Sequence, residues 1–144
     1  KGLLSTLELP GGGKLRLLAV HLEHRREEVR IAGARAIERA RLASKTPMIA
    51  AGDFNSSPPE YPRSSPAAEG RTALSLLLAG GGFATAVRKA PGAADMTFPS
   101  TGPDRAIDWV LAPPGWKLLE HRPLDSKLSD HLPVFARVGL PASR

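Results

Sequence analysis

The stretch Pro47-Met48-Ile49-Ala50-Ala51-Gly52-Asp53-Phe54-Asn55-Ser56 is a short apolar run that ends in a glycine and small polar residues. Apolar positions bounded by Pro47 and Gly52 are typical of a buried strand. If the chain stays extended past Gly52, the side chains of Asp53 and Asn55 project from the same side. The stretch then predicts a carboxylate and a carboxamide sharing one pocket at the strand end. A simple strand-to-turn junction is the alternative, since Gly, Asp and Asn all favour turns.

Two apolar runs and a helical pattern lead into this strand. Residues 3–9 and 15–22 are separated by a proline and three glycines, a pattern typical of a β-hairpin. Residues 25–44 then place apolar side chains at helical spacing. A strand, a helix and another strand predict a crossover unit whose strands run parallel. His21, near the end of the second run, and Asp53 are therefore expected at the same edge of one sheet.

The helix expected over residues 25–44 has one apolar stripe, made of Val29, Ala32, Ala36, Ile37 and Ala40. Its charged residues, Arg30 among them, are expected mostly off this stripe. Such a helix would cover one face of a sheet.

The remainder of the chain alternates loops with short elements. Proline, glycine and serine predict loops over residues 56–70 and 90–104. A leucine-rich segment predicts a short helix over residues 71–79, and residues 83–87 are expected to be briefly extended. Further strands are expected over residues 105–112, 116–120 and 130–138.

The composition indicates one globular domain. The 144 residues are 42% hydrophobic and 24% charged, which suits a single domain with a modest core. The absence of cysteine excludes disulfides and thiolate metal sites, so oxygen and imidazole would have to hold any metal, which favours magnesium, manganese or calcium. No apolar run is long enough to span a bilayer, and a soluble protein, cytoplasmic or secreted, is expected.

The net charge of +6 would suit a polyanionic partner such as nucleic acid or an anionic membrane surface. The arginines are dispersed, however, so a protein that is merely basic is an equal alternative.

Four short motifs follow one another along the chain: Val20-His21-Leu22, Gly52-Asp53-Phe54-Asn55, Ile107-Asp108-Trp109 and Ser129-Asp130-His131-Leu132-Pro133-Val134. In this order they resemble the endonuclease/exonuclease/phosphatase superfamily of metal-dependent phosphodiesterases and phosphatases, which includes pancreatic-type deoxyribonuclease and inositol polyphosphate 5-phosphatase. The resemblance implies an α/β fold of the α+β type, a four-layer α/β sandwich similar to deoxyribonuclease I. It covers residues 1–144 as a single domain.

The resemblance assigns three residues to the proton chemistry of phosphoester hydrolysis. Such a reaction needs a base or orienting group for the attacking water. Asp53 matches the aspartate that orients or deprotonates this water, and His131 can contact the phosphate or handle a proton. Asp108 matches the aspartate that fixes the orientation of this histidine. Whether Asp53 or His131 is the base stays open.

Three further residues are implied to act on the phosphoryl group and the metal. Asn55 matches the carboxamide that donates to a phosphoryl oxygen, and His21 matches the histidine that contacts the phosphate. Asp130 resembles a metal-linked aspartate, because a hard cation prefers carboxylate oxygen. The resemblance implies Mg²⁺ or Mn²⁺ as the cofactor.

Plainer interpretations exist for single residues. His21 alone would fit a core or edge histidine, Asp108 a turn cap or a partner of Arg105, and Asp130 a cap. His24 and His121 lie outside the motifs and are expected on the surface.

The start of the chain departs from the family pattern. Members carry an N-terminal half with an early asparagine and a glutamate that is the principal metal ligand, whereas residues 1–20 match neither and Glu8 is in the wrong context. The chain, which begins at Lys1 in a predicted strand, is therefore interpreted as the C-terminal half of the domain. Its expected partner is the preceding N-terminal segment, which would supply the glutamate. Weak metal binding and poor stability of residues 1–144 alone follow from this interpretation.

The sequence thus predicts a divalent-metal-dependent phosphohydrolase acting on a phosphoester substrate, with nucleic acid as one candidate and a phosphodiesterase or endonuclease as the leading interpretation. A lipid or inositol-phosphate phosphoesterase of the same fold is an alternative, as is a non-catalytic binding module. A chance coincidence of motifs in an unrelated α/β domain is a third.

Overall fold

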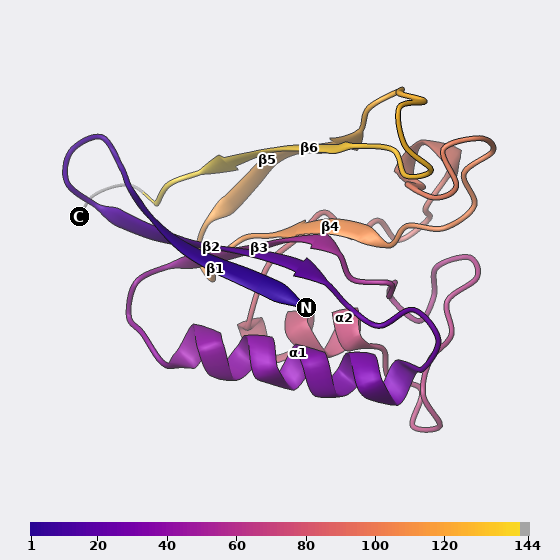
Figure 1. Ribbon diagram of the computed structural model, residues 1–144, viewed down its shortest axis with the longest axis horizontal. Helices are drawn as coiled ribbons and strands as arrows, with labels where there is room; N and C mark the ends of the chain where they lie inside the picture. Colours follow the sequence, from indigo (N-terminus) through magenta and orange to yellow (C-terminus); the bar gives the residue numbers. More distant parts are fainter. Residues whose placement is uncertain (142–144) are drawn as a thin grey trace.

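A sheet of four strands separates two helices from a second, two-stranded sheet (Figure 1). The computed structural model describes residues 1–141. The helices are α1 (Glu27–Leu42) and α2 (Ala73–Leu78), which pack on one face of the larger sheet. The strands are β1 (Gly2–Glu8), β2 (Lys14–His21), β3 (Met48–Asp53), β4 (Asp108–Leu111), β5 (Lys117–Pro123) and β6 (Val134–Gly139).

The larger sheet has the strand order β1-β2-β3-β4, and its register collects three polar residues at one end. β1 and β2 form the expected antiparallel hairpin, and β2 and β3 run parallel on either side of the α1 crossover. In this register His21 lies opposite Asp53, and Asp53 lies opposite Asp108 on the antiparallel neighbour β4. The prediction that His21 and Asp53 share one sheet edge is confirmed.

Gly52 permits β3 to run close beside β2. Its φ of +135° lies in a region that side-chain-bearing residues rarely adopt. A Cβ at this position would lie 2.2 Å from the carbonyl oxygen of Val20. The glycine before Asp53 therefore permits the close pairing of β2 and β3 in which Asp53 lies opposite His21.

The apolar stripe predicted for α1 is partly wrong. Ile37 is buried as expected, but Val29 is exposed and Arg30 is buried. The buried face of the helix is Glu27, Arg30, Ala34 and Ile37. Arg30 can be buried because two of its nitrogens lie 2.6 and 2.8 Å from the Glu27 carboxylate, which compensates its charge.

Several predicted elements have different bounds. The last strand begins at Val134, after Pro133, so Asp130 and His131 lie in the loop before it. The brief extended piece expected over residues 83–87 is limited to a single antiparallel bridge, between Ala84 and Ala112. The loop over residues 90–104 contains the 3₁₀ turn η2 (Ala93–Asp95).

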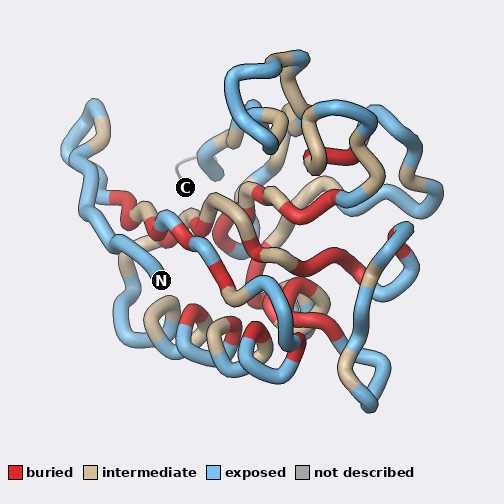
Figure 2. The backbone as a smooth tube through the Cα atoms, turned by 45° about the vertical axis from the view of Figure 1, so that its right-hand side comes forward, coloured by how far each residue is buried: buried red, intermediate tan, exposed pale blue. Residues whose placement is uncertain are grey.

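Apolar side chains remain exposed on the outer strands. Every residue of β1 is exposed, and Figure 2 shows this strand in the colour of exposed residues beside the buried strands of the sheet. Leu119 on β5 and Phe135 on β6 are also exposed. Among the helices of residues 1–141, none is long and apolar enough to cross a membrane.

Candidate active site

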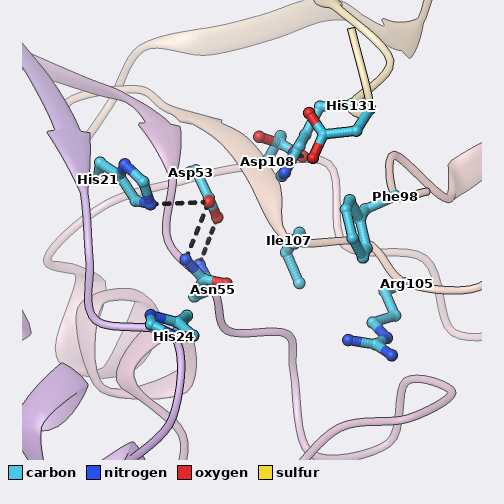
Figure 3. A pocket seen from close by; sticks show the side chains of 10 residues that line it. His21, His24, Asp53, Asn55, Phe98, Arg105, Ile107, Asp108 and His131 are labelled. Carbon is cyan, nitrogen blue, oxygen red and sulfur yellow. Dashed lines mark hydrogen bonds and ion pairs between the residues drawn. The ribbon is translucent and has the colours of Figure 1, made fainter. Parts of the chain in front are cut away.

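An open cavity of about 650 Å³ lies at the end of the larger sheet where β2 and β3 end and β4 begins. All six residues that the sequence singled out line it: His21, Asp53, Asn55, Asp108, Asp130 and His131. Figure 3 shows Asp53 between His21 on one side and Asp108 with His131 on the other. The fold therefore gathers residues from four separate motifs into one cavity.

Asp53 and Asn55 form a turn at the end of β3 and also share one pocket, so both interpretations of their motif apply. The Asn55 backbone N–H donates to Asp53 Oδ1 at 2.7 Å, which closes a tight turn, and Asn55 has a φ of +47°. In the same turn, Asn55 Nδ2 donates to Asp53 Oδ2 at 2.9 Å and to the carbonyl oxygen of Leu22 at 3.2 Å. The turn thus fixes a carboxylate and a carboxamide side by side, facing the cavity (Figure 3).

His21 is the most exposed member of this group. Its side chain is 70% exposed, and its Nε2 lies 3.4 Å from Asp53 Oδ2. Because it projects from the last residue of β2, it borders the cavity without belonging to the core. Of the two plain interpretations of His21, the core histidine is wrong, whereas a histidine at the edge of the sheet is compatible with this exposure.

Asp108 and His131 form a pair from two distant segments. His131 Nδ1 lies 2.8 Å from Asp108 Oδ2. The backbone N–H of Asp108 donates to the buried Thr97 hydroxyl, which anchors the start of β4. A carboxylate bonded to Nδ1 leaves Nε2 as the free ring nitrogen of this histidine.

The loop that carries His131 is pinned to the segment 97–100. The backbone N–H of Ser100 donates to the carbonyl oxygen of Asp130, and that of Leu132 donates to the carbonyl oxygen of Thr97, each at 2.7 Å. The Ser100 hydroxyl donates to the carbonyl oxygen of Ser129. These bonds hold His131 against β4 although the loop belongs to neither sheet.

The electrostatics of this pair favour a protonated imidazole. Burial lowers the pKa of His131, but the hydrogen bond to Asp108 and the charges of Asp108, Asp53 and Asp130 outweigh it, and the pKa is raised overall. Burial raises the pKa of the Asp108 carboxyl, an effect that hydrogen bonds from Thr97 and His131 oppose. His131 therefore keeps its proton to a higher pH than an ordinary histidine, beside a carboxylate that orients it.

A candidate metal-binding cluster lies in the same place. Asp53, Asp108 and His131 each offer a ligand atom within 4.8 Å of the other two. Asp130, which the resemblance linked to the metal, is exposed, lines the cavity and accepts a hydrogen bond from the Ser129 hydroxyl. Among the described residues, the cluster does not include Asp130.

Sequence reasoning missed other residues that line the cavity. His24 is exposed as expected but lines it, and its position three residues after His21 was the available signal. The Phe98 ring packs on His131 with ring centroids 4.7 Å apart, and Arg105 borders the same cavity. Phe98 lies in a loop without periodicity, so no pattern pointed to it.

The expectation that His121 is a surface residue is wrong. It is half-buried and stacks on Trp109, with ring centroids 5.9 Å apart, and burial lowers its pKa. Because β5 extends to Pro123 rather than ending at residue 120, His121 faces the larger sheet instead of a loop.

Comparison of the sequence with protein families matches residues 5–131 to the Endonuclease/Exonuclease/phosphatase family. A comparison with curated proteins gave no match.

Solved structures share the fold. An endonuclease/exonuclease/phosphatase from Beutenbergia cavernae superposes with a TM-score of 0.66 at 23% identity, over 96% of this chain and 39% of that one. The human Nocturnin catalytic domain with bound sulfate superposes with a TM-score of 0.65 at 17% identity, over 96% of this chain and 52% of that one. The mannosyl-6-phosphatase Bt3783 of Bacteroides thetaiotaomicron superposes with a TM-score of 0.62 at 16% identity, over 90% of this chain and 53% of that one.

The chain spans about half the length, or less, of these structures. The two helices, the larger sheet and the two-stranded sheet thus represent about half of a deoxyribonuclease I-like α/β domain, and the predicted fold class is confirmed. Since the family match covers most of the sequence, the chain belongs to the endonuclease/exonuclease/phosphatase family.

Proposed function

We propose that the full-length protein is a divalent-metal-dependent phosphohydrolase that cleaves phosphodiester bonds by attack of water on phosphorus. The observation that carries the proposal is that the Asp53–Asn55 turn and the Asp108–His131 pair face one open cavity. Family membership supports the reaction class, because this family is largely composed of metal-dependent phosphoester hydrolases.

Asp53 and Asn55 are proposed to act on the attacking water and the phosphoryl group. The Asp53 carboxylate accepts hydrogen bonds from Asn55, which fix its direction while it orients the water or takes up its proton. The two Nδ2 hydrogens of the Asn55 carboxamide donate to Asp53 and to the Leu22 carbonyl, so donation to a phosphoryl oxygen requires that the substrate replace one of these acceptors. His21 at the rim would contact the same phosphate.

His131 is proposed to donate a hydrogen bond or a proton from Nε2 to the phosphoryl group. Asp108 holds Nδ1 and stabilises the imidazolium, so the pair presents a positive charge where negative charge develops on the substrate. Asp108 acts through His131 and is a positioning residue.

The donor set fits a hard cation. The Asp53 and Asp108 carboxylates each offer an oxygen within 4.8 Å of the other, and Mg²⁺ or Mn²⁺ prefers such oxygen ligands, whereas His131 in its protonated form would not be a ligand. Asp130 and a glutamate from a preceding segment of the domain are proposed as further ligands. When bound, the cation supplies neutralisation of charge on the phosphoryl oxygens.

The test is hydrolysis by the full-length polypeptide of bis-p-nitrophenyl phosphate and plasmid DNA, with Mg²⁺ or Mn²⁺ and with chelator. We expect turnover of the small diester that chelator abolishes. Plasmid DNA is included because the net charge of +6 over residues 1–144 would suit a polyanion. Mannose 6-phosphate is the comparison substrate, because one similar structure is a mannosyl-6-phosphatase. Failure to hydrolyse both diesters would contradict the proposal, and turnover of mannose 6-phosphate alone would indicate a phosphomonoesterase instead.

A further inference from the structure

A smaller cavity of about 90 Å³ adjoins the main one. Four residues line both cavities: His24, Asn55, Arg105 and Ile107. Asn55, the proposed phosphoryl donor, therefore lies at their junction. Figure 3 shows Arg105 and His24 on opposite sides of this end of the site, away from His131. A substrate whose phosphoester occupies the main cavity would extend into the smaller one.

The smaller cavity carries an excess of positive charge. Arg30, Arg63 and Arg105 line it together with Glu27. The buried Arg30 is neutralised by Glu27, so it is a structural pair. Arg63 and Arg105 share one carboxylate, that of Asp104, at 2.6 and 3.5 Å, which leaves one positive charge in excess.

Both arginines keep donors available for a ligand. Each approaches Asp104 through Nε rather than through its two terminal nitrogens. A guanidinium presents a fork of donors that matches a phosphate group. Asp104 forms a close ion pair with Arg63, whereas its 3.5 Å contact with Arg105 is long, so neither guanidinium is saturated by this carboxylate.

An aromatic ring also connects Arg105 to the histidine of the site. Arg105 lies over the Phe98 ring at 5.5 Å, and Phe98 packs on His131. The arginine position is thus coupled through one ring to the histidine of the proposed reaction.

We propose that Arg63 and Arg105 form a second anion subsite, which binds a phosphate group adjacent to the phosphoester that is cleaved. The inference rests on the proposed function for the identity of the first site. It defines the substrate as a molecule with at least two neighbouring phosphates, either a nucleic acid strand or a small bisphosphate.

Equilibrium binding to the full-length polypeptide in chelator tests the subsite apart from turnover. The dinucleotides pTpT and TpTp are compared with TpT, and a hexose 1,6-bisphosphate with the hexose 6-phosphate. We expect the extra phosphate to tighten binding about tenfold in one of the two series, the effect of a charged hydrogen bond. A gain in the dinucleotide series identifies a nucleic acid strand, and a gain in the sugar series identifies a small bisphosphate.

The variants R63Q and R105Q should each remove most of this preference. Their side chains are 62% and 45% exposed, so folding is not at risk, and circular dichroism verifies it. Arg71→Gln is the matched control, since Arg71 is exposed, pairs with Glu69 and lies at the end of the same loop. It should keep the full preference.

Two results would overturn the inference: no preference in either series, or a preference that survives in both R63Q and R105Q. The proposed function fails separately. If the preference depends on the arginines but no phosphoester is hydrolysed with metal, the anion subsite stands and the catalytic proposal falls.

Discussion

Gly52 is the residue on which the geometry of the site depends most closely. Its missing side chain lets the Val20 carbonyl pass at a distance that any Cβ would violate, and its φ is positive. The Gly52 backbone and the Val20 carbonyl belong to paired strands, so neither can move away without breaking the pairing of β2 with β3. A glycine before Asp53 is thus a condition for placing the carboxylate.

Replacing Gly52 by alanine should therefore lower the free energy of unfolding by about 3 kcal/mol or more, through steric overlap and backbone strain. Urea denaturation measures the change. Gly92→Ala is the control, because Gly92 has an ordinary negative φ and a Cβ added there would meet no atom within 4 Å. Equal stability of the two variants would show that β2 and β3 tolerate a side chain here.

The Asp108–His131 pair gives a titration with a definite sign. Asp108→Asn removes the carboxylate that raises the pKa of His131, so this pKa should fall. NMR titration of the His131 ring protons measures it, with Asp125→Asn, a change at an exposed position, as the control. An unchanged pKa of His131 in Asp108→Asn would refute the pairing.

The same pair makes stability depend on pH. The folded pKa of His131 lies above its usual value of 6.5, so protonation stabilises the fold fully below that pH. This contribution is lost as the pH rises through the folded pKa. Asp108→Asn should flatten this part of the stability profile.

At the scale of elements, helix α1 shows where pattern reading succeeds and where it fails. Its existence and its crossover role follow from the apolar spacing, and so does the parallel pairing of β2 and β3. The buried face of α1 does not follow from this spacing, because Arg30 is buried together with its ion-pair partner Glu27, one turn earlier. Hydrophobic periodicity carries no information about such compensation.

Glu27 links α1 to the segments that flank the site. Its Oε1 accepts hydrogen bonds from the Ser56 hydroxyl and from the backbone N–H of Ala73, the first residue of α2, while Oε2 pairs with Arg30. One buried carboxylate therefore joins the helix pair to the chain that follows Asn55.

Glu27→Gln should lower the free energy of unfolding by about 3 kcal/mol, because it leaves the buried Arg30 charge without its partner. Chemical denaturation measures the loss. Glu28→Gln, an exposed change on the same helix turn, is expected to be close to neutral. If the two variants are equally stable, the Glu27 network contributes little.

The positions of His131 and Asp130 were less predictable than those of Asp53 and His21. Strand order and crossover direction place residues that end strands, and this placed Asp53 and His21. Asp108 was singled out by the family resemblance alone, and the structure puts it at the start of β4. His131 lies in a loop whose position depends on backbone hydrogen bonds to segment 97–100, which has no pattern of its own. Phe98, Arg63 and Arg105 also lie in loops, and no sequence pattern predicts which side chains of a loop come together.

At the scale of the whole molecule, the exposed apolar side chains of β1, β5 and β6 are the main feature. Leu3, Leu4 and Leu7 lie on one strand, and Leu119 and Phe135 lie on the other sheet. The chain spans about half of the solved structures with this fold. These surfaces are where further parts of such a domain would pack.

A polypeptide of residues 1–144 alone should therefore bind the dye ANS and unfold with low cooperativity, because these apolar surfaces stay in contact with water. The full-length polypeptide, under the same conditions, is the comparison. Sharp two-state unfolding of residues 1–144 without dye binding would contradict this expectation.

The most direct test of the proposed function is the metal-dependent kcat/KM of the full-length protein on bis-p-nitrophenyl phosphate, compared between wild type, Asp53→Asn and the control Asp125→Asn. Asp53 lies at the centre of the cavity and accepts both hydrogen bonds from Asn55, so its loss should lower the rate by about 10² to 10⁴. The control, an exposed aspartate, should match the wild type. An Asp53→Asn variant that keeps the wild-type rate, or a wild type without metal-dependent turnover, would contradict the account.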